Sequence, residues 1–281
     1  MLIAILLAAA HVATPNAHGA APRIDVAFAL DTTGSMGDEI DVVKEKIVEI
    51  ARKISAGQPA PDVRFGIVAF RDRGDLYVTR TFPFSREIAD VEKTLRTLDA
   101  AGGGDEPEAV AEGLYAAVHE LQWDFAKDTA RMIFLIGDAG PHEYPDGKNW
   151  RKVASEAAEK GITISVLGCS GLSAAGEQVF EKIARIADGT MMHLTYTRVA
   201  LRPDGRRYSV LNEGGKTYLA DRELSESDWK KGASELVKEG KVNAAASPPP
   251  ATTSEPMKNN LDAEIAAGVK SRAEKLGVTY H

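Results

Sequence analysis

The sequence contains little cysteine and no excess of positive charge. Cys169 is the single cysteine among 281 residues, which excludes an internal disulfide framework and any zinc or iron–sulfur site built from several thiolates. The 34 Lys and Arg residues are outnumbered by 41 Asp and Glu, and the net charge of −7 argues against a nucleic-acid partner. Hydrophobic residues nevertheless make up 44% of the chain, enough to bury a sizeable core, so global disorder is excluded.

The N-terminal hydrophobic run is too short to span a membrane. It covers residues 1–10, whereas a membrane-spanning helix needs roughly 20 residues. Its length and the small residues Ala17 and Gly19 that follow indicate a secretory signal peptide at residues 1–19, although no Lys or Arg precedes the run. We therefore expect an exported protein, periplasmic or extracellular, with no integral membrane span in the mature chain.

Short apolar runs alternate with amphipathic stretches from residue 23 to residue 197, the pattern of βαβ units around a parallel sheet. Near-continuous apolar runs predict buried strands, at residues 24–30, 63–70, 130–136, 162–167 and, more weakly, 191–194. The alternating segment 76–82 predicts an antiparallel edge strand. Helices are predicted at residues 37–54, 86–98, 107–121, 149–160 and 176–187. We expect an α/β fold: a doubly wound, mostly parallel six-stranded sheet with helices on both faces, spanning residues 20–198.

The pattern weakens beyond residue 198. Turn residues at Pro203-Asp204-Gly205 and Glu213-Gly214-Gly215 predict one or two hairpins over residues 201–219, and residues 225–237 predict a short helix. Together they make a small β/α extension at residues 199–243. Residues 244–257 are a linker by their Pro, Ser, Thr and Ala composition, and residues 258–281 form a tail with a modest helical stripe.

Three oxygen-bearing side chains alternate in the segment Asp31-Thr32-Thr33-Gly34-Ser35-Met36, where the first strand ends and the first helix begins. Ligands of open α/β sheets bind at the carboxyl ends of the strands, so this is the expected place for a site. Asp31, Thr33 and Ser35 can all turn inward from one tight loop. Their carboxylate and hydroxyl oxygens suit a hard cation such as Mg²⁺, Mn²⁺ or Ca²⁺, and not zinc.

Two further carboxylates stand in matching positions. Asp105 ends the flexible loop Gly102-Gly103-Gly104-Asp105, and Asp138 follows the strand predicted at residues 130–136. In a doubly wound sheet both loops open onto the same edge as Asp31. Three carboxylates about 5 Å apart repel each other by roughly 3 kcal/mol per pair at an effective dielectric constant of 20. They must therefore bind a cation, take up a proton or stay apart.

These residues resemble the metal-ion-dependent adhesion site (MIDAS) of the von Willebrand factor type A (vWA) domain family. That site has a D-x-S-x-S loop after the first strand, a threonine from a glycine-rich loop and an aspartate after the fourth strand. The resemblance covers residues 23–197 and implies a Rossmann-like sheet of strand order 3-2-1-4-5-6. It also implies one ion, Mg²⁺ or else Mn²⁺ or Ca²⁺, at Thr33, Ser35 and Asp105, with Asp31 and Asp138 acting directly or through water.

Asp105 is the departure from the family pattern, because it stands where the family has its threonine. The loop of residues 102–109 looks like that of a bacterial and protist subgroup with Asp in this position. An additional carboxylate holds the ion more tightly but neutralises more of its charge. The ion's pull on an acidic residue of a partner is weakened accordingly.

The resemblance implies a non-enzymatic protein that binds another protein at the ion, where an acidic residue of the partner completes the coordination. The alternative is a metal-dependent hydrolase or phosphoryl-handling enzyme that uses the same carboxylates, with His142 as a candidate base. No set of nucleophile, base and orienting group accompanies the cluster, so we favour the binding protein. Two further readings stay open: a purely structural ion, and Asp31 and Ser35 as mere caps of the first helix.

Overall fold

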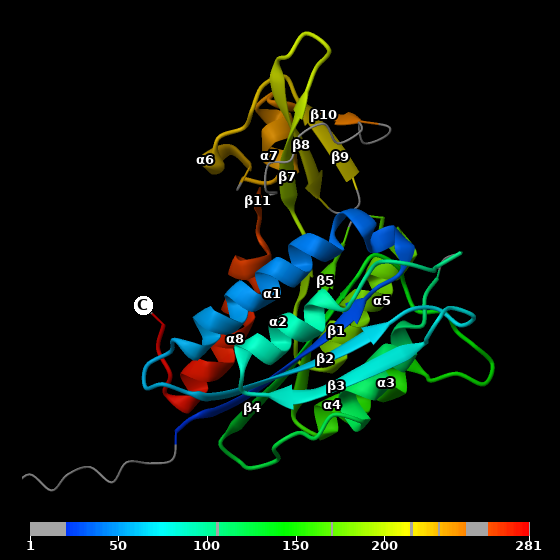
Figure 1. Ribbon diagram of the computed structural model, residues 1–281, viewed down its shortest axis with the longest axis vertical. Helices are drawn as coiled ribbons and strands as arrows, with labels where there is room; N and C mark the ends of the chain where they lie inside the picture. The colour runs from blue at the N-terminus through cyan, green and yellow to red at the C-terminus, as the bar shows by residue number, and fades with distance from the viewer. Residues whose placement is uncertain are drawn as a thin grey trace, which may run out of the picture.

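Two sheets of unequal size organise the molecule in the computed structural model (Figure 1). The structure describes residues 21–104, 107–169, 171–213, 216–229, 231–245 and 258–280. The signal peptide expected at residues 1–19 lies outside the described residues, as do residues 246–257 of the expected linker. Among the helices that the structure describes, none has both the length and the apolar character that a membrane crossing requires.

The larger sheet has six strands in the order β3-β2-β1-β4-β5-β6. Its strands are β1 (Arg23–Asp31), β2 (Asp62–Phe70), β3 (Thr79–Ser85), β4 (Thr129–Gly137), β5 (Ile162–Gly168) and β6 (Met191–His193). All neighbouring strands pair in parallel except β3, which is antiparallel to β2. The predicted six-stranded, mostly parallel sheet and its strand order are confirmed. The edge strand lies three residues further along the chain than residues 76–82.

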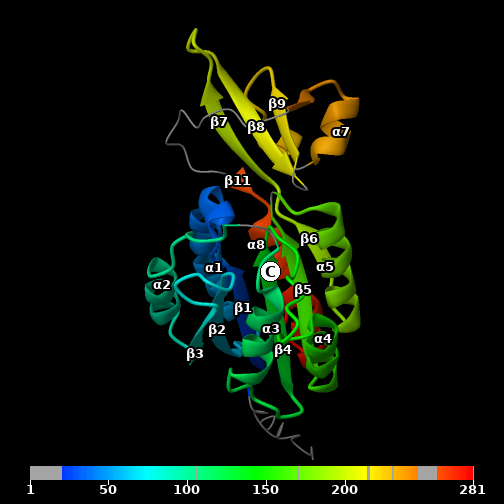
Figure 2. The same cartoon turned by 90° about the vertical axis from the view of Figure 1, so that its right-hand side faces the viewer.

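Helices cover both faces of this sheet (Figure 2). They are η1 (Gly34–Asp38), α1 (Ile40–Ser55), α2 (Ile88–Arg96), α3 (Val110–His119), α4 (Trp150–Glu159) and α5 (Ala174–Ile186). Side chains of β1 alternate between the two layers: Val26 and Phe28 pack with α1 and α2, whereas Ala27 and Ala29 pack with α3, α4 and α5. The doubly wound α/β fold is therefore confirmed.

Two helices begin three residues later than predicted, and both starts lie beside the predicted site. The helix expected from residue 37 is preceded by the 3₁₀ turn η1, and α1 begins at Ile40. The helix expected from residue 107 begins only at Val110. Glu108 instead forms a β-bridge with Pro141, which draws the start of this segment toward the loop that follows β4.

The smaller sheet has five antiparallel strands in the order β10-β9-β8-β7-β11. They are β7 (Tyr196–Leu201), β8 (Arg207–Glu213), β9 (Lys216–Ala220), β10 (Val242–Ala245) and β11 (Lys258–Asn259). The helix expected at residues 225–237 is two short helices, α6 (Glu226–Trp229) and α7 (Ala233–Lys238). Gly232 lies between them with a φ of 80°, a conformation that interrupts a helix.

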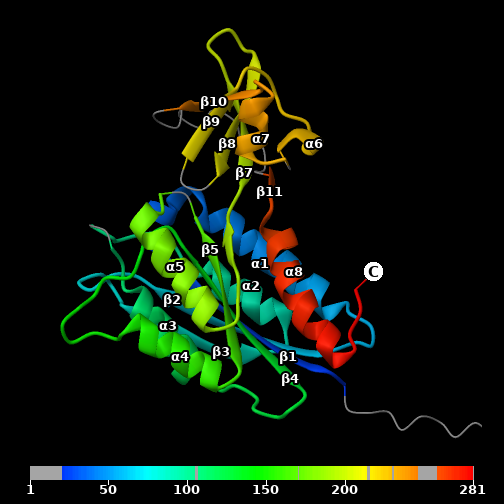
Figure 3. The same cartoon turned by 180° about the vertical axis from the view of Figure 1, so that it is seen from behind.

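The C-terminal segment returns to the larger sheet (Figure 3). After β11, α8 (Leu261–Ala273) and η2 (Glu274–Leu276) follow, and Ile265 and Val269 of α8 are buried in the core beneath α1. Asn260 links the two chain segments that join the sheets: its side chain accepts the Thr195 N–H at 2.8 Å and donates to the His193 carbonyl at 3.0 Å. The chain therefore leaves the larger layer before β7 and returns to it after β11 at the same place.

Candidate metal centre

Asp31, Thr33 and Ser35 converge at the carboxyl end of β1, the strand between β2 and β4. Asp31 is fully buried as the last residue of β1. Its Oδ1 accepts the Thr33 backbone N–H at 2.9 Å and the Thr33 hydroxyl at 2.6 Å. The Ser35 hydroxyl lies 3.1 Å from Thr33 Oγ1. Because the Thr33 proton is donated to Asp31, Ser35 donates to Thr33.

Helix capping does not explain these contacts. The residue that precedes η1 is Thr33 and the residue that precedes α1 is Glu39, and neither side chain makes a capping hydrogen bond. Ser35 lies inside η1, and Asp31 binds Thr33 instead of the first amides of α1. The interpretation of Asp31 and Ser35 as caps of the first helix is therefore wrong.

The glycine-rich loop packs directly on the loop of Thr33 and Ser35. Gly34 donates its N–H to the Gly102 carbonyl at 3.0 Å, and a Cβ at Gly34 would lie only 2.7 Å from that oxygen. Gly102 and Gly103 have φ values of 77° and 65°, which favour glycine. The loop thus requires glycine at these positions. Asp105, the loop's predicted metal ligand, lies outside the described residues.

Asp138 follows β4 and is buried beside the same edge of the sheet. Burial and, to a smaller extent, the negative charge of Asp138 raise the pKa of Asp31 to about 7. The two carboxylates therefore lie close enough for their charges to interact. Glycine at position 137 leaves room for the Asp31 carboxylate, because a Cβ there would lie only 3.2 Å from Asp31 Oδ2.

Glu108 is a buried carboxylate of the site that the sequence interpretation missed. Its N–H donates to the Gly140 carbonyl at 3.0 Å, and its own carbonyl accepts the His142 N–H at 2.7 Å. These bonds fix the glutamate beside the loop that follows β4. A Cβ at Gly103 would lie 2.8 Å from Glu108 Oε1 and 2.9 Å from Thr33 Cβ, so the two side chains flank the Gly103 backbone.

The charge environment of Glu108 is strongly acidic. Burial, together with the carboxylates of Asp31, Asp72 and Asp138, raises the pKa of Glu108 to about 8. A sequence signal for this residue existed, because Glu108 stands three positions after Asp105 in the same glycine-rich loop. The sequence analysis missed Glu108 because it placed residue 108 inside a helix predicted from residue 107, whereas α3 begins at Val110.

The loop between β2 and β3 completes the surroundings of the site. Gly103 donates its N–H to Asp75 Oδ2 at 3.0 Å, and the Tyr144 hydroxyl donates to Asp72. Arg73 binds Asp146 at 2.6 Å and lies over the Tyr144 ring. Both charged side chains of the Arg73-Gly74-Asp75 sequence are therefore engaged within the molecule.

His142 lies in the loop that follows β4, where its N–H donates to the Glu108 carbonyl. Its ring stacks on Tyr144, with 4.1 Å between the ring centroids. Its Nδ1 is buried and has no hydrogen-bond partner among the described residues. The contact that the structure shows for this ring is therefore its stacking on Tyr144.

Oxygen donors of two kinds are available for a cation. No three His, Cys, Asp or Glu side chains among the described residues are grouped closely enough to hold a metal ion by themselves. The hydroxyls of Thr33 and Ser35 are further oxygen donors beside the described carboxylates. Asp31 Oδ2 and Glu108 Oε2 are buried and accept no hydrogen bond from a described residue. Buried carboxylate oxygens without a donor fit a hard divalent cation.

Comparison with known proteins decides the family. The family model of the von Willebrand factor A domain matches residues 25–200, more than half of the chain. The chain belongs to the von Willebrand factor A domain family. The match includes the whole larger sheet except the first two residues of β1, together with Glu108 and the four described positions of the predicted site.

Curated relatives match this chain over a small part of their own length. The alpha-protein kinase vwkA of Dictyostelium discoideum is 30% identical over 121 residues, which are 42% of this chain and 19% of that protein. The human von Willebrand factor A domain-containing protein 7 is 33% identical over 122 residues, 43% of this chain and 12% of that protein. Mouse hemicentin-2 is 25% identical over 205 residues, 71% of this chain and 4% of that protein.

Two solved structures are similar to this vWA chain. Proximal thread matrix protein 1 of the mussel byssus, with a zinc-occupied MIDAS motif, is 18% identical with a TM-score of 0.49. That similarity covers 62% of this chain and 42% of the mussel chain. The pilus adhesin SpaC of Lactobacillus rhamnosus GG is 12% identical with a TM-score of 0.48, over 74% of this chain and 38% of the adhesin.

Proposed function

We propose that this vWA domain binds one divalent cation, Mg²⁺ or else Mn²⁺ or Ca²⁺, at the carboxyl end of β1. The observation that carries the proposal is the pair of buried carboxylate oxygens, Asp31 Oδ2 and Glu108 Oε2, that accept no hydrogen bond from a described residue beside the Thr33 hydroxyl. Leaving such oxygens without a donor is costly inside a protein, and a cation removes that cost.

The proposed ligands combine hydroxyls and carboxylates. Thr33 and Ser35 contribute their hydroxyl oxygens, and Asp31 and Asp138 act directly or through water. Asp105, from the glycine-rich loop of the proposed bacterial-type subgroup, supplies a further carboxylate. We add Glu108 to this set of ligands because its carboxylate and the Thr33 side chain flank the Gly103 backbone. An all-oxygen set of this kind favours hard cations.

The proposed role of the ion is to dock another protein, without catalysis. Several carboxylates already compensate the charge of the ion, so an acidic residue of the partner needs help from contacts around it. Leu76 is placed to supply one: its side chain is 80% exposed. The neighbouring Asp75 accepts the Gly103 N–H, and Tyr77 Oη lies 2.8 Å from Thr32 Oγ1. A leucine held between two anchored residues is preorganised for contact. Export to the periplasm or the outside of the cell is part of the same proposal.

Calorimetry and thermal melting test the metal site. Titration of the chelator-treated protein with Mg²⁺, Mn²⁺ or Ca²⁺ should give one ion per chain, and the ion should raise the melting temperature by mass action. Replacing Asp31 by Asn and Ser35 by Ala should abolish the rise, whereas Asp41→Asn, an exposed change on α1, should preserve it. Identical melting curves with and without the ion, and no heat of binding, would refute the proposal.

Protein binding requires a separate experiment. The protein is used as bait in an extract of its native host, with the ion or with chelator, and retained proteins are identified. A partner retained only with the ion, and lost with the Asp31→Asn variant, supports docking at the ion. A partner that binds the variant equally well would assign the ion a purely structural role.

A further inference from the structure

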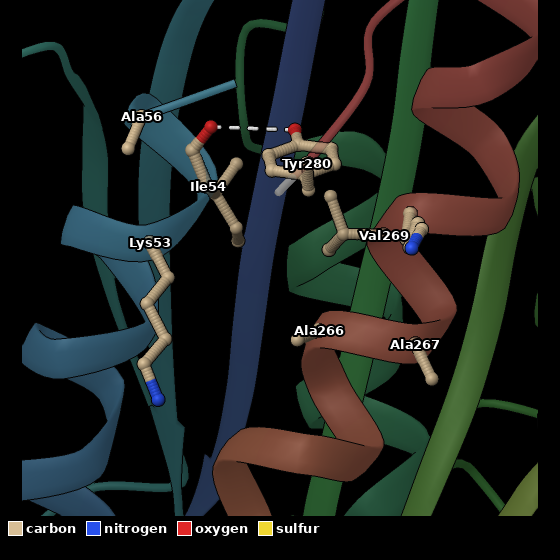
Figure 4. A pocket seen from close by; sticks show the side chains of 8 residues that line it. Lys53, Ile54, Ala56, Ala266, Ala267, Val269 and Tyr280 are labelled. Carbon is tan, nitrogen blue, oxygen red and sulfur yellow. Dashed lines mark hydrogen bonds between the residues drawn. The ribbon is translucent and has the colours of Figure 1, made fainter. Parts of the chain in front are cut away.

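A cavity of about 500 Å³ lies between α1 and α8, at the end of α1 that is remote from the candidate metal centre. Figure 4 shows the last turns of α1 on one side, α8 on the other and the Tyr280 ring between them. The 16 residues of α1 span about 24 Å, so the cavity and the metal centre are separate sites. The volume of the cavity falls in the range of roughly 300–1,000 Å³ that is typical of small-molecule sites.

Short side chains keep the cavity open. Ala56 follows α1, and Ala266 and Ala267 lie on α8, so no long side chain from these positions fills the gap between the helices. Ile54 and Val269 contribute apolar surface from the core of the larger layer.

The C-terminal segment closes one end of the cavity. Gln58 and Thr279 exchange backbone hydrogen bonds of 2.8 and 2.7 Å. The Tyr280 hydroxyl donates to the Ile54 carbonyl at 3.3 Å, which holds the ring between α1 and α8. The cavity is therefore a built feature of the packed tail and not a gap beside a loose end.

The charged residues that line the cavity are all positive. They are Lys53 and Lys270, and no Asp or Glu is among the lining side chains that the structure describes, although the chain has a net charge of −7. Lys53 also binds Glu49 at 2.9 Å, which partly compensates its charge. Lys270 forms no ion pair with any residue that the structure describes. The hydrocarbon stems of lysines extend an apolar wall while their ammonium groups stay at its rim.

We propose that this cavity binds an amphipathic anion with a single apolar chain, such as an alkyl carboxylate. The apolar chain occupies the space between Ile54, Val269 and the Tyr280 ring, and the carboxylate lies at the mouth beside Lys270. Each buried CH₂ group strengthens binding about fourfold, so the chain supplies most of the affinity. The lysines supply the selection for negative charge.

Calorimetric titration of the full chain with decanoate tests the proposal. We expect one decanoate per chain, and octanoate should bind about sixteenfold more weakly because it lacks two CH₂ groups. Decyltrimethylammonium, with the same chain and the opposite charge, should bind more weakly than decanoate. Absence of decanoate binding, or equal binding of the cationic amphiphile, would overturn the proposal.

Three variants locate the ligand. Ala266→Trp fills the cavity and should abolish decanoate binding. Lys270→Glu changes an exposed side chain, leaves the core intact and should weaken binding at least about threefold. Lys152→Glu, an exposed change on α4 at the other face of the sheet, is the matched control and should bind like the unchanged protein. Should Ala266→Trp fail to fold, Lys270→Glu still decides, because unchanged affinity in that variant contradicts the assignment.

Discussion

Asp31 Oδ1 accepts two hydrogen bonds from Thr33, one from the backbone N–H at 2.9 Å and one from the hydroxyl at 2.6 Å. Because both donors of Thr33 bind Oδ1, Asp31 Oδ2 receives no hydrogen bond from Thr33. The bond from the hydroxyl also commits the Thr33 proton to Asp31, so the hydroxyl presents lone pairs toward the space beside Ser35. A single two-residue contact thereby orients both a carboxylate oxygen and a hydroxyl oxygen for a cation.

Thr33→Val should abolish cation binding and leave the fold intact. Valine keeps the shape of threonine but lacks the hydroxyl, so the cation loses an oxygen ligand, while loss of the hydrogen bond costs about 1 kcal/mol of stability. We expect a folded protein whose melting temperature no longer rises with Mg²⁺. Thr33→Ser restores the hydroxyl and should recover most of the rise. A full rise in the valine variant would remove Thr33 from the ligand set.

Glu108→Gln should stabilise the chain when no cation is bound and reduce the effect of the cation. The substitution removes a buried acid whose pKa burial and neighbouring carboxylates raise to about 8. Chelator-treated samples at about pH 8 should therefore melt at a higher temperature, and added Mg²⁺ should shift melting less than in the unchanged protein. Glu159→Gln, an exposed change at the end of α4, is the control. A variant that responds fully to Mg²⁺ would show that Glu108 does not serve the ion.

The stability of the metal-free chain should fall as the pH rises from about 4 to about 8. The pKa values of Asp31 and Glu108 are raised to about 7 and about 8, mainly by burial. The folded chain therefore binds more protons than the unfolded chain over this interval, and the free energy of unfolding decreases with pH. A cation that replaces these protons should raise the melting temperature more at about pH 8 than at about pH 5. Equal shifts at both values would show that cation binding displaces no proton.

Arg64→Met should destabilise the fold without affecting the cation. Arg64 binds the buried Asp25 through two nitrogens, at 2.8 and 2.6 Å. Removing one partner of a buried ion pair costs about 3–5 kcal/mol. Asp25 lies six residues before Asp31 on β1, about 20 Å away, so the melting-temperature rise on adding Mg²⁺ should persist. Denaturant titration measures the loss, and a loss below about 1 kcal/mol would contradict the assigned role of the pair.

Ile265→Ala should destabilise the larger layer, although Ile265 follows the smaller sheet in the sequence. Its side chain is fully buried in the core that β1, β4 and α1 share. Truncating a buried isoleucine to alanine costs about 2–5 kcal/mol. We expect one cooperative transition at a lower denaturant concentration, with a loss of cation binding only where the fold is lost. An unchanged midpoint would mean that α8 contributes nothing to the core.

Residues of the site that are close together in sequence could be predicted, whereas a residue positioned by a distant contact could not. Asp31, Thr33 and Ser35 share one tight turn, so their convergence follows from local spacing, and the hydrogen bonds among them agree with it. Glu108 could not be assigned in the same way. Its burial depends on a β-bridge to Pro141, a contact across 33 positions that no local pattern encodes.

The amino-acid sequence by itself determined the α/β layer, because continuous apolar runs that alternate with amphipathic segments are typical of parallel strands buried between two helical layers. The strand order was implied by the family resemblance and not by this alternation. The sequence also determined the oxygen chemistry of the turn after β1. Tertiary structure decided what depends on distant contacts: the burial of Glu108 beside Thr33, the return of α8 to the core and the cavity that Tyr280 closes. Periodicity specifies which face of a segment is apolar, but only packing specifies which partner covers that face.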